Sequence, residues 1–166
     1  MKPYHFFIFI TFTFVLIACD NQEKTCQFGS PQAIFSQKLE KVEQHEFTAN
    51  QQEAKERAVF ENGLDLEIFQ SGCDTIRQVF QSTFTEDLSQ ENANFFIEMA
   101  IQQFFYLGSV SSDHFTLNYL GQTIQDQFHD IKLGQALELQ PNYFIKIDKI
   151  TGKTETVLIV ELMSNI

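Results

Sequence analysis

The spacing of apolar residues changes from every second residue to every third or fourth and back again, and this restricts the fold more than any other feature. Period two is typical of strands with one buried face, and period 3.6 of amphipathic helices. The first period-two stretch, Arg57 to Gln70, surrounds Asn62-Gly63, a pair that suits the two positive φ values of a type I′ turn. This stretch is therefore predicted to be a β-hairpin, and residues 75–85 a third strand.

Two helices are expected in the middle of the chain. Ser89 is a candidate N-cap, and apolar residues then recur at spacings of three and four until Gly108, a candidate stop. A second helix is expected from Asp113 to about Asp130. The two apolar stripes comprise Ala93, Phe96, Ile97, Ala100, Phe104 and Leu107, and Leu117, Leu120, Ile124 and Phe128.

Period two returns in the C-terminal third, where an alternating stretch from Tyr143 to Ile147 leads to a turn at 151–153. The strand that follows, Val157 to Leu162, is apolar on both faces, as expected of a strand between two neighbours. Residues 37–54 fit either a strand or a ragged helix, and we take the strand. The order of strands, two helices and strands predicts an α+β domain, with about two helices packed on one face of an antiparallel sheet.

The first residues have the order of a secretory signal, with Lys2 before an apolar run, Phe6 to Ala18, that is too short to span a bilayer comfortably. Leu16-Ile17-Ala18-Cys19, at the end of this run, resembles the lipobox of bacterial lipoproteins. The resemblance implies that residues 1–18 are removed and that Cys19 is acylated on its sulfur and amino group, which is enough for stable membrane anchoring. The alternative is a plain signal peptide with an incidental Cys.

Asp20, directly after this Cys, resembles the inner-membrane retention signal of enterobacterial lipoproteins. It favours the inner membrane, with the domain facing the periplasm. Residues 19–33 are expected to be the lipidated tether, and residues 34–166 one globular domain, because the length allows only one sizeable core.

Cys26 and Cys73 remain as an even pair in a compartment where disulfides persist, so we expect a bond between them. It would close a loop of about 48 residues and contribute roughly 4 kcal/mol by chain entropy. The sequence has no Cys-x-x-Cys and no His placed to complete a zinc site. A catalytic role for the Cys73 thiol is the remaining alternative.

The charge of the chain is strongly acidic, with 22 Asp and Glu against 11 Lys and Arg. Nucleic acid and bare anionic lipid surfaces are therefore poor partners. Between Arg77 and Lys132 there is no Lys or Arg, whereas seven acidic residues fall inside this stretch. The stretch is predicted to present a surface of one sign, either as a solvated helical face or as a contact surface.

A non-enzymatic, membrane-anchored envelope protein that binds another protein is the main functional hypothesis. Phe105 and Tyr106 lie off the main apolar stripe of the first helix, so they are either buried inside the domain or part of an exposed apolar patch. The candidate partner-binding residues are Glu91, Glu98, Phe105, Tyr106 and Asp126. A cationic partner such as a lysozyme would complement the negative charge of this chain. A second form of the same hypothesis is an accessory role in an envelope complex. No cofactor is expected.

A metal-dependent or hydrolytic envelope enzyme is the alternative. Asp126, His129 and Asp130 are spaced at i, i+3 and i+4, which would place them on one face of the second helix. Two carboxylates beside an imidazole can bind a divalent metal or tune a general base. The sequence contains none of the common nucleotide-binding, serine-hydrolase or zinc-protease motifs.

Overall fold

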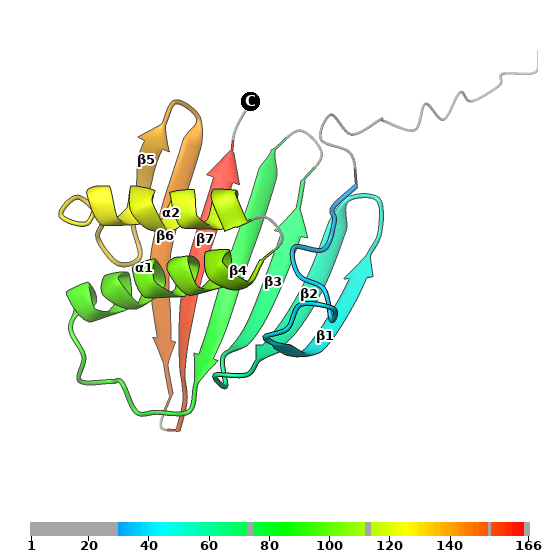
Figure 1. The fold of residues 1–166 in the computed structure, drawn as a ribbon. Coiled ribbons are helices and arrows are strands. Elements are labelled where there is room, and N and C mark those ends of the chain that lie inside the picture. The colour runs from blue at the N-terminus through cyan, green and yellow to red at the C-terminus, as the bar shows by residue number, and fades with distance from the viewer. Residues whose placement is uncertain (1–29, 73–74, 112–113, 153, 165–166) are drawn as a thin grey trace, which may run out of the picture.

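The computed structural model describes residues 30–72, 75–111, 114–152 and 154–164 as one antiparallel sheet and two helices (Figure 1). Cys19, Asp20, Cys26 and Cys73 lie outside the described residues. The elements along the chain are β1 (Val42–Ala49), β2 (Glu53–Phe60), β3 (Asp65–Ser71), β4 (Ile76–Phe84), α1 (Ala93–Val110), α2 (His114–Asp126), β5 (Ala136–Gln140), β6 (Tyr143–Thr151) and β7 (Thr156–Ser164).

The seven strands follow the order β1-β2-β3-β4-β7-β6-β5, and every neighbouring pair is antiparallel. The strand predicted for 37–54 is correct in part, because β1 covers Val42–Ala49 whereas residues 37–41 form turns and Glu53 already begins β2. The last strand lies between two neighbours as expected. The strand β5 was not predicted. It is short, and its alternating residues are exposed or half-buried, so it lacks the strong apolar signal of a central strand.

The predicted hairpin is formed by β2 and β3, but its turn is not of type I′. Gly63 has a φ of 82°, whereas Asn62 is absent from the positive-φ residues of the described chain. The Gly63 N–H donates to the Phe60 carbonyl at 2.8 Å, and the Phe60 N–H donates to the Leu64 carbonyl at 3.0 Å. This pattern is typical of a type I turn followed by a glycine bulge, in which only the glycine needs a positive φ.

The first helix begins and ends later than predicted. Its N-cap is Asn92, whose side chain accepts from the Phe95 N–H at 3.1 Å. Ser89 instead donates to the Asp87 carboxylate, and its hydroxyl and backbone N–H lower the pKa of that carboxyl. The helix continues through Gly108 to Val110. None of the helices in the described part of the chain is long and apolar enough to cross a membrane.

Both helices lie in front of the same sheet face in Figure 1, but they are attached to it differently. α1 contacts β6 and β7, and its Phe104 ring packs edge-on against Phe80 of β4 at 5.1 Å. α2 packs chiefly on α1. The prediction of two helices on a sheet is therefore correct in outline, whereas direct packing on the sheet is mainly a property of α1.

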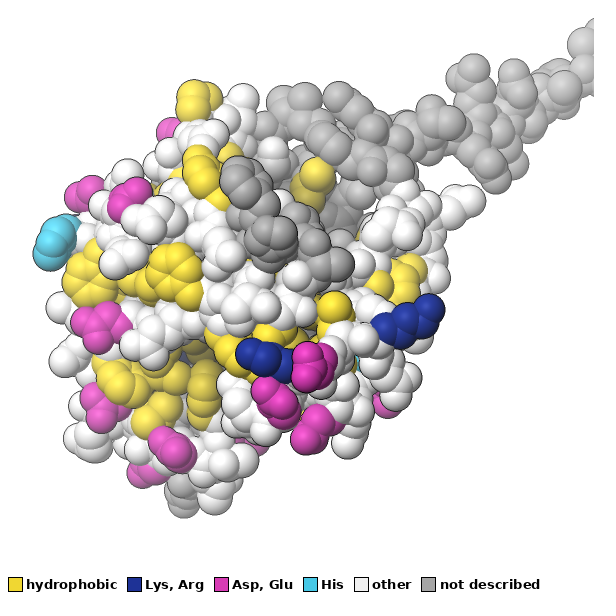
Figure 2. All heavy atoms as spheres, in the orientation of Figure 1, with side chains coloured by type: hydrophobic (Ala, Val, Ile, Leu, Met, Phe, Trp, Pro, Cys, Tyr) yellow, Lys and Arg dark blue, Asp and Glu magenta, His cyan; other side chains and the backbone are white. Residues whose placement is uncertain are grey.

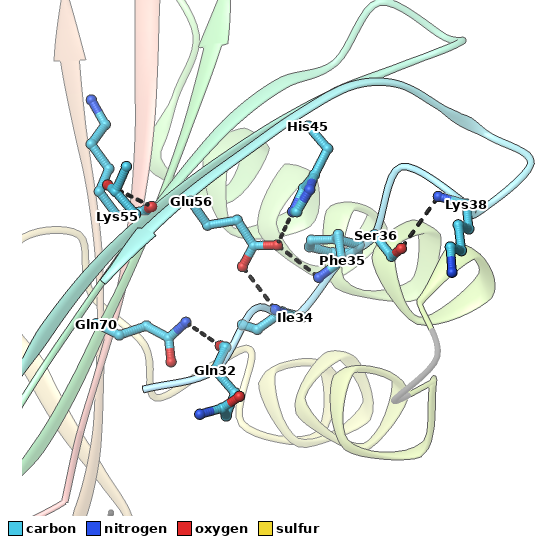
Figure 3. Close-up of polar contacts among 10 residues, drawn as sticks. Gln32, Ile34, Phe35, Ser36, Lys38, His45, Lys55, Glu56 and Gln70 are labelled. Atoms are coloured by element: carbon cyan, nitrogen blue, oxygen red, sulfur yellow. Dashed lines mark hydrogen bonds and ion pairs between the residues drawn. The ribbon is translucent and has the colours of Figure 1, made fainter. Parts of the chain in front are cut away.

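An N-terminal strap, residues 30–36, lies across β2 and β3 on the helix side (Figure 3). The fully buried Glu56 carboxylate of β2 accepts from the backbone N–H groups of Ile34 at 2.8 Å and Phe35 at 2.7 Å. His45 Nε2 of β1 lies 2.9 Å from the same carboxylate. Phe35 packs edge-on against Phe60 at 5.2 Å. Glu56 therefore joins the strap, β1 and β2 at one buried point.

Replacing Glu56 with Ala should lower the free energy of unfolding by about 3–5 kcal/mol, because His45 and two backbone donors lose their buried acceptor. Glu56→Gln should cost less, since an amide oxygen can still accept. Glu53→Ala is the control, because Glu53 is an exposed carboxylate on the same strand, and its loss should cost no more than about 0.5 kcal/mol. Urea unfolding measures the stability of all three variants. Equal stability of E56A and E53A would contradict the structural role of the buried Glu56 carboxylate.

Candidate protein-binding groove

The helices α1 and α2 are in closest contact at two glycines. A Cβ at Gly108 would lie 2.5 Å from Asn118 Oδ1 and 2.9 Å from the Asn118 backbone N. A Cβ at Gly121 would lie 3.2 Å from the ring of Phe105. Gly108 is therefore not a helix stop but the residue that lets α2 approach α1 closely.

A groove of about 550 Å³ lies between the middle of α1 and the end of α2 with the turn that follows it. Ile101 is almost fully buried and forms its floor, while Phe105 and Phe128 are half-buried. The lining residues are Glu98, Ile101, Gln102, Phe105, Gln125, Phe128 and His129. The groove therefore combines an apolar floor with polar and acidic walls.

One acidic side chain lines the groove, and others follow its lining residues in the sequence. Exposed Glu98 stands on its α1 wall, and exposed Asp126 follows the lining residue Gln125. The Asp126 carboxylate accepts from Gln122 Nε2 at 2.8 Å. Figure 2 shows hydrophobic side chains gathered on the left of the view, over the helices, with carboxylates around them. Among the described acidic residues between Arg77 and Lys132, Glu98 thus lines the groove, and Asp126 and Asp130 are next in sequence to the lining residues Gln125 and His129.

The predicted partner-binding residues do not all lie together. Glu98 and Phe105 line the groove, and Asp126 is beside it. Glu91 precedes the N-cap of α1, where its backbone carbonyl accepts from Lys149 Nζ at 3.3 Å. Tyr106 lies on another side of α1, where it packs edge-on against Phe60 at 5.6 Å. Burial, and secondarily the charge of Glu61, raise the pKa of the Tyr106 phenol.

The weak metal candidates Asp126, His129 and Asp130 do not share a helix face. α2 ends at Asp126, and the chain turns directly afterwards because the Gln127 carbonyl accepts from both the Asp130 and Ile131 N–H groups. The His129 ring packs edge-on against Phe128 at 5.4 Å. Among the described residues, no group of three His, Cys, Asp or Glu is arranged to hold a metal ion.

Sequence reasoning missed Ile101, Gln102, Gln125 and Phe128 as groove residues. The periodicity assigns Phe128 to the buried stripe of the second helix, whereas α2 ends at Asp126 and Phe128 lies half-buried in the turn that follows. One sequence feature does indicate the groove. The spacing of Glu98, Ile101 and Phe105 places an acidic residue beside apolar ones on one face of a helix.

A second hollow, of about 650 Å³, lies on the open face of the sheet beside Lys55, Phe69 and Arg77. Although larger, it is less suited to a charged partner, because both cations are already paired. Lys55 forms an ion pair with Glu67, and Arg77 with Glu161. We therefore take the groove between the helices as the candidate site.

Replacing Gly108 with Ala should lower the free energy of unfolding by about 1–3 kcal/mol, because the new methyl group overlaps Asn118. Intrinsic helix propensity alone predicts the opposite change, because Ala stabilises a helix by about 1 kcal/mol relative to Gly. Asn94→Ala, at an exposed position of the same helix, is the control. Urea unfolding measures the effect, and a stabilised G108A chain would show that the helices are not in close contact there.

Comparison with protein families, with curated proteins and with solved structures found no match to this chain. The function of the groove therefore has to be inferred from the chemistry of its own side chains.

Proposed function

We propose that this chain is a lipid-anchored bacterial envelope protein, facing the periplasm, that binds a cationic protein partner through the groove between α1 and α2. The supporting observation is the combination of an apolar floor with acidic surroundings, in a stretch that has no Lys or Arg between Arg77 and Lys132. The proposed role is non-enzymatic.

The groove has the composition that protein interfaces favour at their centres. Half-buried aromatic rings such as Phe105 and Phe128 provide anchors that bury apolar area on binding. Carboxylates such as Glu98 and Asp126 stay near the rim, where they steer a cationic partner and add specificity. A lysozyme is one concrete form of such a partner, and a basic subunit of an envelope complex is a second.

Membrane attachment is proposed from the signal and lipobox resemblance of residues 1–19. The strap supports it indirectly, because Glu56 and Gln70 fix residues 32–35 to the sheet at the end of the proposed tether. Residues 19–29 could extend at most roughly 40 Å. A domain held in this way stays close to the membrane while its tether is fixed at a defined point.

The proposed disulfide is supported by a contact between the two segments that carry its cysteines. Gln70 Nε2 donates to the Gln32 carbonyl at 2.9 Å. Cys73 follows Gln70 by three residues, and Cys26 precedes Gln32 by six. Six extended residues reach roughly 20 Å, which is ample for the two thiols to meet. The bond would reinforce the attachment of the strap.

Intact mass spectrometry of the chain extracted from bacterial membranes tests both modifications. The expected mass is that of residues 19–166 with a diacylglycerol and an amide-linked acyl chain. Alkylation should add mass to Cys26 and Cys73 only after reduction. A Cys19→Ser chain that still partitions into membranes, or free thiols at both other positions, would contradict the corresponding proposal.

Neutralising the groove charges should weaken binding of a cationic protein. We expect the triple variant Glu98→Gln, Asp126→Asn and Asp130→Asn to bind a lysozyme about tenfold more weakly at low salt, because three rim charges each contribute up to about 0.5–1 kcal/mol. The matched control replaces Glu43, Glu53 and Glu155 with Gln, which removes the same charge away from the helices. Calorimetry on the detergent-solubilised mature chain at low and high salt measures both.

An equal loss of affinity in the two triple variants would mean that only net charge matters. A lysozyme that fails to bind would direct the search to other basic envelope proteins, tested by capture with the same pair of variants. Failure of every basic protein to distinguish the variants would refute the proposed acidic binding surface.

A further inference from the structure

We infer that the groove binds an amphipathic helix of the partner, with its apolar residues against Phe105 and Phe128 and a Lys or Arg beside Glu98 and the end of α2. This inference rests on the proposed function and specifies the form of the binding segment. It depends on the geometry of the two walls, on their hydrogen bonding and on the charge at one end.

One wall of the groove is a strip of helical spacing. On α1 the lining residues Glu98, Ile101 and Phe105 are separated by three and four positions. On the other side, Gln125 belongs to α2, whereas Phe128 and His129 lie in the turn that follows it. The α1 strip forms a ridge, and the depression beside such a ridge accepts a ridge of side chains from another helix. A helix lying along the groove would fit this shape.

An extended peptide fits the α1 wall poorly because it would find no backbone partners there. The main-chain groups of the α1 wall are bonded within that helix, so a buried strand would leave its own N–H and C=O groups unpaired. A helix satisfies these groups internally. Addition of a strand to the sheet is also disfavoured, since both edge strands contain irregular register, between Val42 and Gln44 in β1 and between Glu138 and Gln140 in β5.

The end of α2 is where the cation of the partner should lie. Asp126 is the last helical residue, and the last turn contains no basic residue. An acidic side chain at a helix C-terminus is unfavourable, because the exposed carbonyls there already carry partial negative charge. Asp130 follows within four residues, and Glu98 stands on the facing wall. A basic side chain at this end would complement both the carboxylates and the carbonyls of the helix C-terminus.

The same charges disfavour two other occupants. A second copy would bring Glu98 and Asp126 against acidic residues like themselves if the two grooves met. An anionic lipid surface would be repelled in the same way. A cationic helix is therefore the occupant that complements both the apolar floor and the acidic rim.

Three synthetic peptides of equal length test the inference on the detergent-solubilised mature chain. The first has Leu on one helical face and Lys on the other, the second has the same residues scrambled so that neither face is apolar, and the third has Glu in place of Lys. Each carries one Trp, whose fluorescence reports binding cleanly because this chain contains no Trp. We expect the first peptide to bind at least about tenfold more tightly than either of the others.

Variants then locate the binding site. Gln102→Arg places a cation on the exposed α1 wall without changing the core and should weaken binding of the first peptide about tenfold. Phe105→Ala and Phe128→Ala should weaken it similarly, with folding checked by urea unfolding. Ile150→Ala is the matched control, because Ile150 is an exposed apolar residue on β6 of the sheet, 61% exposed, and should have no effect.

The outcomes separate the inference from the proposed function. If the scrambled peptide binds as tightly as the amphipathic one and Q102R has no effect, the helix inference is refuted while an acidic binding surface remains. If neither Lys peptide nor any basic protein binds, the proposed function fails as well. Self-association of the chain that Q102R abolishes would assign the groove to a second copy and overturn the inference.

Discussion

The pairing of β4 with β7 is the interaction on which the rest of the structure depends. It joins the first four strands to the last three along nine residue pairs, from Ile76 opposite Ser164 to Phe84 opposite Thr156. α1 lies over this junction, where Phe104 packs against Phe80, and Lys149 of β6 lies 4.0 Å from the centre of the Phe96 ring. Because α2 packs chiefly on α1, the position of the groove follows from this one junction.

The charge distribution follows from the same layered arrangement. Cations on the open face of the sheet are neutralised within it, as when Lys55 pairs with Glu67 and Arg57 with Asp65. The described part of the helical layer differs, since the sequence from 78 to 131 supplies carboxylates and no Lys or Arg, and Lys149 of β6 reaches α1 over the Phe96 ring. The cations of these pairs are therefore held by carboxylates of the sheet itself, whereas the carboxylates of α1 and α2 have no Lys or Arg on their own helices.

Much of the fold could be predicted from periodicity, whereas the groove could not. The hairpin around Gly63 and the helix containing Phe104 are local signals that the structure confirms. The turn type was wrong because Asn-Gly permits two positive φ values but does not require them. The prediction that the first helix ends at Gly108 is wrong, because a single sequence cannot show that Asn118 packs against this glycine. The buried role of Glu56 was equally invisible, since it depends on the strap and on β1.

The groove depends on what packs between the two helices. Gly108 lets α2 approach closely at Asn118, and Gly121 leaves room for the half-buried ring of Phe105, while Phe128 is a second half-buried ring just after the end of α2. Larger residues at the glycines would separate the helices and flatten the depression, whereas smaller residues at the aromatic positions would remove its anchors. Local sequence thus determines both how closely the two helices pack and which aromatic rings remain half-buried, and this partly exposed apolar area is the feature on which the proposed binding rests.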